Sequence, residues 1–300
     1  MQLFTYWARR SQRHYAAGGR LYHLIAYAGS DVSPGDAARQ ADEQLRGRVM
    51  RLDHGQRLRN YPLGTAPLRE ALLQRLSGPD GQLLGAVTRN RYGSPVLNTT
   101  GLMMLDVDLD DLRPKYPWTP PPRKSLWQRL QELFSPPPRP RPVPLADIPE
   151  PRAVLDAKLA QWLAQHPDWN VRLYATRLGY RLLVTHAPLD PNGPAAEAAF
   201  RELPVDPIYA RLCRSQACYR ARLGPKPWRM GMKRPAQAFP YASEAEEAEQ
   251  ARWEQQYAAR SQQYAVCELL GSFGSGHVYP EAEPLLALHD AACLGSGRLA

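Results

Sequence analysis

The segment from Gly101 to Asp111 constrains the fold most, because an apolar run there ends in aspartates at alternate positions. Successive side chains of a β-strand point to opposite faces. A strand here therefore separates two sets of residues: Leu105, Val107 and Leu109 toward a core, and Asp106, Asp108 and Asp110 on the other face. The pattern predicts a half-buried strand with an acidic face.

The acidic face has the spacing of a metal site. Neighbouring acids lie about 7 Å apart at Cα, since each residue of a strand rises about 3.3 Å. Two such carboxylates can converge on one hard cation or on a metal pair, and without a cation they repel each other. We therefore predict that Asp106 and Asp108 bind Mg²⁺ or Mn²⁺ for phosphoryl chemistry. The alternative is a solvated strand end whose acids serve solubility.

The composition fits a globular protein with a basic surface. The 300 residues are 44 % hydrophobic, and Lys plus Arg exceeds Asp plus Glu by 9. This excess is carried by arginine and permits nucleotide or nucleic-acid partners. The N-terminus lacks signal-peptide features, and no apolar run reaches the length of a membrane span. We expect a cytoplasmic chain.

The cysteines lack the Cys-x-x-Cys spacing of common metal sites, which favours buried thiols in a reducing cytosol. The alternative is a zinc site that uses all four of them, with or without His277. The four are Cys213, Cys218, Cys267 and Cys293.

The order of elements predicts an α+β domain with mixed or antiparallel sheets flanked by helices. We expect strands at 21–27, 83–91, 96 onward, 169–174, 180–185 and 264–270, and helices after Ser33 and at 67–76, 151–166, 194–203 and 243–260. Turn residues at 92–95 and 175–179 predict two hairpins. We expect the acidic strand to pair with the strand immediately before it.

A Pro-rich insertion divides this domain. Residues 1–111 form its N-terminal half, 112–150 the insertion, and 151–300 its C-terminal half. Within the insertion, 125–134 predicts a short amphipathic helix between polyproline-like flanks. The helix could dock on its own domain, act as a lid, or bind a protein partner or a membrane surface.

Two basic segments could bind phosphate. The hairpin at 172–181 carries Thr176, Arg177 and Arg181 near its turn, where two guanidinium groups and a hydroxyl suit a triphosphate. The second segment predicts a strand with Arg220 and Arg222 on one face, followed by a proline-stiffened loop that presents cations and an aromatic ring. These loop residues are Lys226, Trp228 and Arg229. The alternative in both cases is a solvated basic hairpin or ribbon.

Taken in order, these elements resemble the archaeo-eukaryotic primase superfamily. The likeness covers about residues 80 to 235: an apolar strand ending in Asp106-x-Asp108, a hairpin with a small residue, and Asp206 a short helix before an Arg-rich strand and a Lys-bearing loop. Arg181 stands at the position of the family's histidine. A second likeness, to a bacterial family marked by 88–93, 96–99 and 220–229, implies no function.

The resemblance implies a primase-like core and nucleotidyl transfer that depends on Mg²⁺ or Mn²⁺. Asp106, Asp108 and Asp206 would bind metal, and the basic residues of the two segments would bind a nucleoside triphosphate or a nucleic-acid end. Two alternatives remain open: a nucleotide- or nucleic-acid-binding protein without turnover, and a scaffold that docks protein partners through the insertion.

Overall fold

The computed structural model describes the chain except residues 17, 57, 59–66 and 114–149. The predicted insertion helix at 125–134 lies outside the described residues. None of the described helices is long and apolar enough to cross a membrane.

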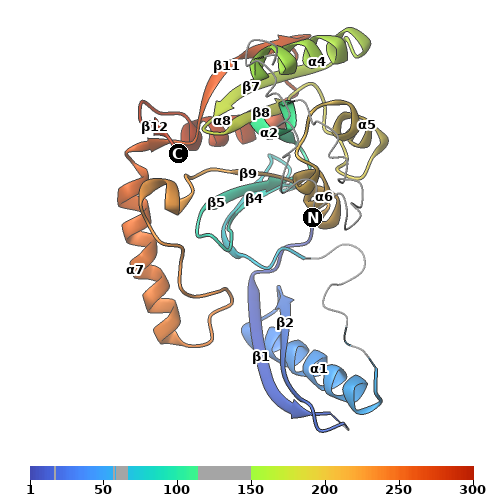
Figure 1. Cartoon of the computed structure of the whole chain (residues 1–300), viewed down its shortest axis with the longest axis vertical. Coiled ribbons are helices and arrows are strands. Elements are labelled where there is room, and N and C mark those ends of the chain that lie inside the picture. The colour runs from blue at the N-terminus through green and yellow to red at the C-terminus, as the bar shows by residue number, and fades with distance from the viewer. Residues whose placement is uncertain (17, 57, 59–66, 114–149) are drawn as a thin grey trace, which may run out of the picture.

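The N-terminal part is a two-stranded ribbon with one helix. Strands β1 (Tyr6–Tyr15) and β2 (Leu21–Ser30) pair antiparallel, and α1 (Pro34–Asp53) packs against them. The Ser33 side chain caps α1 by accepting a hydrogen bond from the Asp36 backbone amide, as the sequence predicts. This unit projects from the rest of the molecule at the bottom of Figure 1.

The remainder contains two four-stranded sheets, described here as the acidic sheet and the basic sheet. The acidic sheet has the order β11 (Cys267–Gly274), β7 (Asn170–Thr176), β8 (Gly179–Val184), β6 (Met103–Asp108). The basic sheet has the order β3 (Ala71–Ser77), β4 (Leu83–Arg89), β5 (Pro95–Thr99), β9 (Tyr219–Arg222). All pairs within both sheets are antiparallel.

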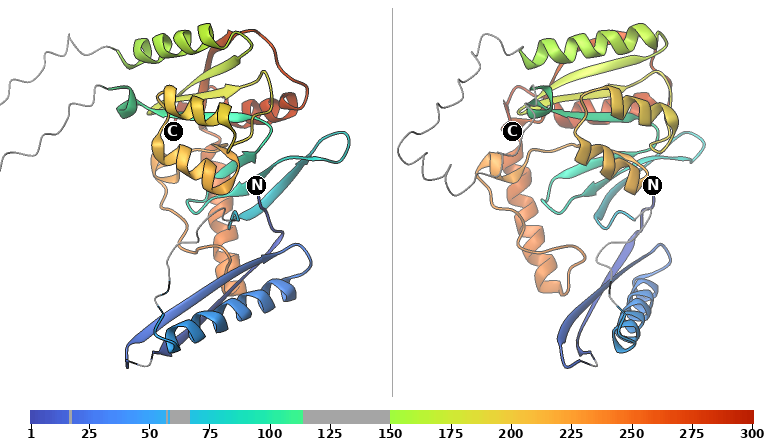
Figure 2. Two further views of the ribbon diagram at one scale, coloured as in Figure 1. Left: turned by 90° about the vertical axis from the view of Figure 1, so that its right-hand side faces the viewer. Right: turned by 45° about the vertical axis from the view of Figure 1, so that its right-hand side comes forward.

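Helices cover the outer face of the acidic sheet and fill the space between the sheets. Helix α4 (Pro151–Gln165) lies on the outer face, and α8 (Ala282–Cys293) lies between the two sheets (Figure 1). Their buried side chains join one hydrophobic cluster with both sheets. Helices α5 (Pro194–Glu202) and α6 (Pro207–Gln216) lie together at one side of this core (Figure 2).

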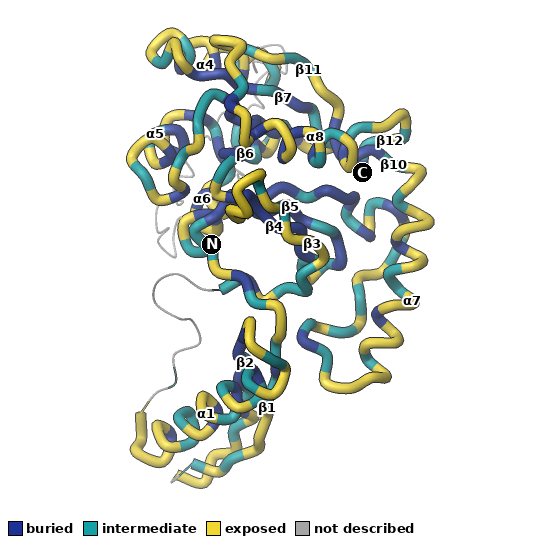
Figure 3. Tube along the Cα trace, turned by 180° about the vertical axis from the view of Figure 1, so that it is seen from behind, coloured by how far each residue is buried: buried dark blue, intermediate teal, exposed yellow. Residues whose placement is uncertain are grey.

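Smaller elements complete the chain. A single turn of helix, α2 (Leu109–Leu112), follows β6, and a 3₁₀ turn, η2 (Pro227–Met230), follows β9. Helix α7 (Glu244–Ser261) is largely exposed, whereas the inner strands β4, β5 and β8 and the edge strand β6 are largely buried (Figure 3). Strands β10 (Tyr264–Ala265) and β12 (Arg298–Leu299) pair in parallel.

The α+β class with antiparallel sheets and flanking helices is confirmed. The predicted helix at 67–76 is wrong, because 71–77 forms strand β3 in a hairpin with β4. The acidic strand also does not pair with the strand before it. A turn at Thr100–Leu102 separates β5 from β6, and each strand joins a different sheet. Strand β1 and helix α8 were not predicted.

Candidate functional site

The acids predicted to bind metal lie at the end of β6. Leu105 and Val107 are buried in the core, while the Asp106 side chain is 25 % exposed and Asp108 is exposed, as the alternation predicts. The Asp206 backbone amide donates to the Asp106 carbonyl at 3.0 Å. This bond brings the start of α6, 100 residues further along the chain, next to the acidic strand.

The end of β6 is held in place by the β7–β8 turn. The Leu109 amide donates to the Leu178 carbonyl at 3.1 Å, and Gly179 pairs with Asp108. A Cβ atom at Gly179 would lie 2.0 Å from the Val107 carbonyl oxygen. Glycine is therefore required at this position for the close approach of β8 to the acidic strand.

Arg181 lies next to Asp106 on the neighbouring strand β8. The two residues are cross-strand partners, and Arg181 Nε lies 3.2 Å from Asp106 Oδ1. Arg181 Nη1 donates to the Arg222 carbonyl at 3.0 Å, and the side chain is 1 % exposed. A bound triphosphate cannot reach a guanidinium that is enclosed in this way. The prediction that Arg181 binds phosphate is therefore wrong. Its side chain orients Asp106 instead.

A buried cluster of Cys267, His289 and Cys293 supports Arg181 from the side opposite Asp106. Arg181 Nη1 lies 3.1 Å from His289 Nε2, and His289 Nδ1 lies 3.0 Å from Asp290 Oδ1. A neutral His289 with its proton on Nδ1 satisfies both contacts. The Cys293 thiol lies 3.5 Å from the Arg222 carbonyl, and hydrogen bonding with Cys293 lowers the pKa of the Cys267 thiol despite its burial.

The four cysteines are free and buried, as the sequence predicts, and the alternative of a zinc site that uses all of them is not formed. The structure brings together two of the cysteines and His289, whose ligand atoms lie within 4.8 Å of one another. The Arg181 guanidinium lies at the imidazole nitrogen that a metal would need, and its positive charge opposes a cation there. The cluster therefore serves to hold Arg181. The four-residue spacing of His289 and Cys293 on a helix was the signal in the sequence.

Asp290 completes this support. It accepts hydrogen bonds from Arg172 Nη2 at 2.7 Å and from the Tyr174 hydroxyl at 2.8 Å. Burial opposes the ionisation of Asp290, but its hydrogen bonds with His289 and Tyr174 and the charge of Arg172 outweigh it and lower its pKa. Asp290 is therefore an ionised anchor for His289.

Four cations gather near the three acids. Burial lowers the pKa of Lys226 to about 8, and repulsion by Arg222 and Arg229 adds to the effect. Burial also lowers the pKa of Arg229, with repulsion from Arg222 and Arg177. Among the described residues, no carboxylate lies within ion-pair distance of these four side chains. Their charges are available to an anion.

The acids also repel one another. Burial raises the pKa of Asp108, and the negative charges of Asp206 and Asp106 raise it further. The three carboxylates are not gathered as tightly as the Cys/His cluster, the one group of three such ligands within 4.8 Å of one another in the described part of the chain. Oxygen donors on two elements still suit Mg²⁺, which is bound through one or two carboxylates plus substrate phosphates and waters.

The loop after β9 carries an exposed aromatic ring. Trp228 is 42 % exposed and packs edge-on against Tyr92, with ring centroids 5.3 Å apart. Lys226 Nζ and the Arg234 guanidinium lie 5.7 and 4.6 Å from the Trp228 ring centre. Sequence analysis did not single out Tyr92 or Arg234. Their presence makes this ring a cationic, partly open stacking surface.

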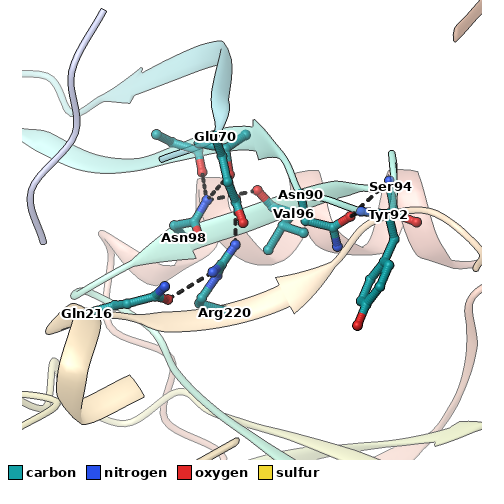
Figure 4. A network of polar contacts seen from close by, with 10 residues as sticks. Glu70, Asn90, Tyr92, Ser94, Val96, Asn98, Gln216 and Arg220 are labelled. Atoms are coloured by element: carbon teal, nitrogen blue, oxygen red, sulfur yellow. Dashed lines mark hydrogen bonds and ion pairs between the residues drawn. The ribbon is translucent and has the colours of Figure 1, made fainter. Parts of the chain in front are cut away.

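Arg220 does not reach the acids. It donates to Glu70 Oε2 at 2.5 Å and to Gln216 Oε1 at 2.8 Å, within a buried polar network that Figure 4 shows. The alternation of Arg220 and Arg222 predicted a shared role, but only Arg222 lies near Asp106. Thr176, at the end of β7, pairs with Gly179 and Cys267.

Comparison with known proteins identifies no relative, since no family model, curated protein or solved structure matches this chain.

Proposed function

We propose that this chain binds a nucleoside triphosphate with Mg²⁺ or Mn²⁺ and transfers its nucleotidyl group, as the resemblance to the primase superfamily implies. One observation carries the proposal: four half-buried or exposed cations, which have no ion-pair partner in the described part of the chain, lie beside three acids. Such cations are destabilising unless an anion binds, and a triphosphate with its metal ion complements both charge sets.

Each group has a distinct task in this proposal. Asp106, Asp108 and Asp206 would hold the divalent ion, which neutralises phosphate charge and activates the attacking hydroxyl. Arg177, Arg222, Lys226 and Arg229 would bind the phosphates, and Trp228 would stack on the base. Arg181 holds the Asp106 carboxylate in place through its Nε contact.

A second candidate function is nucleotide binding without turnover. Its support is the ion pair of Arg181 with Asp106, since a carboxylate already bound to a guanidinium donates less charge to a metal ion. Arg181 also stands where the related family has histidine. A partner-docking role for residues 119–144 lies outside the described residues and stays a prediction.

Calorimetry with Mn²⁺ and a non-hydrolysable triphosphate tests binding. We expect Asp108→Asn to abolish Mn²⁺ binding, and the neighbouring Asp110→Asn, whose side chain is 88 % exposed, to leave it unchanged. Lys226→Ala should weaken triphosphate binding by about 1–3 kcal/mol, the usual size of a charge-assisted hydrogen bond. Lys233→Ala, an exposed lysine of the same loop, is its matched control.

Product formation from a labelled triphosphate and an oligonucleotide then separates the two candidates. Metal-dependent extension that is lost in Asp108→Asn supports transfer. Tight triphosphate binding without any product supports the binding protein. Equal Mn²⁺ affinity in wild type, Asp106→Asn and Asp108→Asn would rule out the metal site.

A further inference from the structure

The N-terminal ribbon has one face that α1 covers and one that it leaves open. In the β1–β2 register, Ala8, Leu24 and Ala28 lie on the covered face and are buried. Arg10 on the same face bonds to Asp42 of α1. Both views in Figure 2 show α1 on one side of the ribbon only.

The other face, called the open face here, combines aromatic rings with cations. Its exposed or half-buried residues are Trp7, Arg9, Ser11, Arg13, Tyr15, Leu21, His23, Ile25 and Tyr27. Tyr15 is 68 % exposed. The guanidinium of Arg69 adds a further cation, stacked 3.8 Å from the centre of the Tyr27 ring. Flat rings and guanidinium groups on a sheet are the surface on which unstacked bases and phosphates bind.

Charge is segregated between the two sides of this unit. None of the residues that alternate onto the open face is an aspartate or glutamate. The acids near the ribbon bond elsewhere: Asp42 and Asp53 with covered-face residues, and Asp36 and Glu43 with Arg39 on the helix. Within the described ranges, Arg9 and Arg13 have no ion-pair partner. The open face is therefore complementary to a polyanion.

The open face is continuous with the candidate site. Arg69, stacked on Tyr27, also lines a cleft together with Arg89 and Arg91. Arg91 lies 4.7 Å from the Tyr92 ring centre, and Tyr92 packs on Trp228 beside Lys226. Alternating rings and cations thus connect the ribbon with the cations near Asp108.

We propose that the open face of the β1–β2 ribbon binds single-stranded nucleic acid and directs it along this track. That the strand is directed toward Asp108 rests on the proposed function, whereas binding of the strand at the ribbon does not. Arg9 and Arg13 would bind phosphates, and the exposed Tyr15 ring would stack on a base. A duplex hides its bases, so the rings favour a single strand.

Fluorescence anisotropy with the full chain, in EDTA and without triphosphate, tests the ribbon alone. The probes are labelled 12-mers of oligo(dT) and oligo(U) and a 12-base-pair duplex. We expect both single strands to bind at least fivefold more tightly than the duplex. The Arg9→Ala/Arg13→Ala variant should bind the single strands about tenfold or more weakly. Its slope of log affinity against log salt should become shallower by about 1.4, or 0.7 per phosphate contact.

The matched control is Arg39→Ala/Arg51→Ala, which removes the same charge from α1. It should change affinity by less than twofold. Tyr15→Ala, at an exposed ring, should cost about fivefold with an unchanged salt slope. Equal losses in the two double variants, equal affinity for the duplex, or no binding of either single strand would each overturn the proposal. Because this measurement is made in EDTA and without triphosphate, failure of the metal site leaves its result intact.

Discussion

Two buried arginine–carboxylate pairs lie in neighbouring sheets, and they differ in what surrounds the acid. Arg220 and Glu70 have side chains 9 % and 13 % exposed, and Thr88, Asn98 and Gln216 complete the network around them. Arg181 is 1 % exposed, but its partner Asp106 is 25 % exposed. The first pair is closed on both sides, and the second is closed only on the side of the arginine.

Under the proposed function, this difference separates a purely structural pair from one that serves the site. Glu70 Oε2 accepts from both the Thr88 hydroxyl, at 2.6 Å, and Arg220, so this oxygen is engaged within the buried network. Asp106 has a fixed position and a carboxylate edge that faces Asp108 and the cation cluster. Under the proposed function, a carboxylate held by a buried guanidinium and open on its other side would be preorganised to bind a metal ion.

The largest effect is expected from breaking the closed pair. Glu70→Ala leaves the Arg220 charge buried with one neutral acceptor, Gln216, and should destabilise the protein by about 3–5 kcal/mol. Glu70→Gln, which keeps an acceptor oxygen, should cost less. Urea denaturation measures both. A loss below about 1 kcal/mol for Glu70→Ala would show that the network is not closed in solution.

Breaking the open pair should cost less. Asp106→Asn should destabilise the protein by about 1–3 kcal/mol, since Arg181 keeps a neutral acceptor and the Cys267 sulfur. If repulsion between the aspartates were the only effect, Asp106→Asn would stabilise the protein. The ion pair with Arg181 makes the substitution destabilising instead. Asp108→Asn, the control, should be neutral or slightly stabilising at pH 7, because the raised pKa of Asp108 means that the fold disfavours its charge. If thermal melts show both variants stabilised, the Arg181 pair contributes nothing.

The cations opposite the open pair should respond to pH. Lys226 has its pKa lowered by burial to about 8, from 10.5. It therefore loses its proton as pH rises through about 8, and triphosphate affinity should fall by about fivefold between pH 7 and 9. Stability should rise from about pH 8 to 10.5, where the unfolded chain holds more protons. Calorimetry at three pH values checks this. Lys226→Arg should bind with pH-independent affinity, and a fall of the same size in that variant would exclude Lys226 as the cause.

The smallest effect on stability is expected at Trp228. The Trp228 ring is 42 % exposed and packs edge-on against Tyr92. Trp228→Ala should therefore lower the free energy of unfolding by about 1 kcal/mol, not by the 3–5 kcal/mol expected for a core tryptophan. Nucleotide affinity should fall by about fivefold with an unchanged salt dependence. A large loss of stability with unchanged nucleotide affinity would assign Trp228 to the core and remove it from the site.

Local pattern was sufficient for several elements. The alternation in β6 correctly separated Leu105 and Val107 from Asp106 and Asp108, and the turn at 175–179 correctly predicted the β7–β8 hairpin. Ser33 marked the start of α1. The helix expected at 67–76 failed because its leucines suit either structure. The Gly78–Gly81 turn, which joins β3 to β4, was the stronger signal.

The sequence by itself determined which residues carry charge, which alternate with apolar neighbours, and where turns and caps occur, because these depend on near neighbours in the chain. Only the tertiary structure decided which charges are already paired. Arg181 and Arg220 stand in similar strand contexts, yet one meets Asp106 and a Cys/His cluster and the other meets Glu70, 150 residues away. Partner choice across such separations follows from the strand order within each sheet, and that order depends on the packing of the whole core.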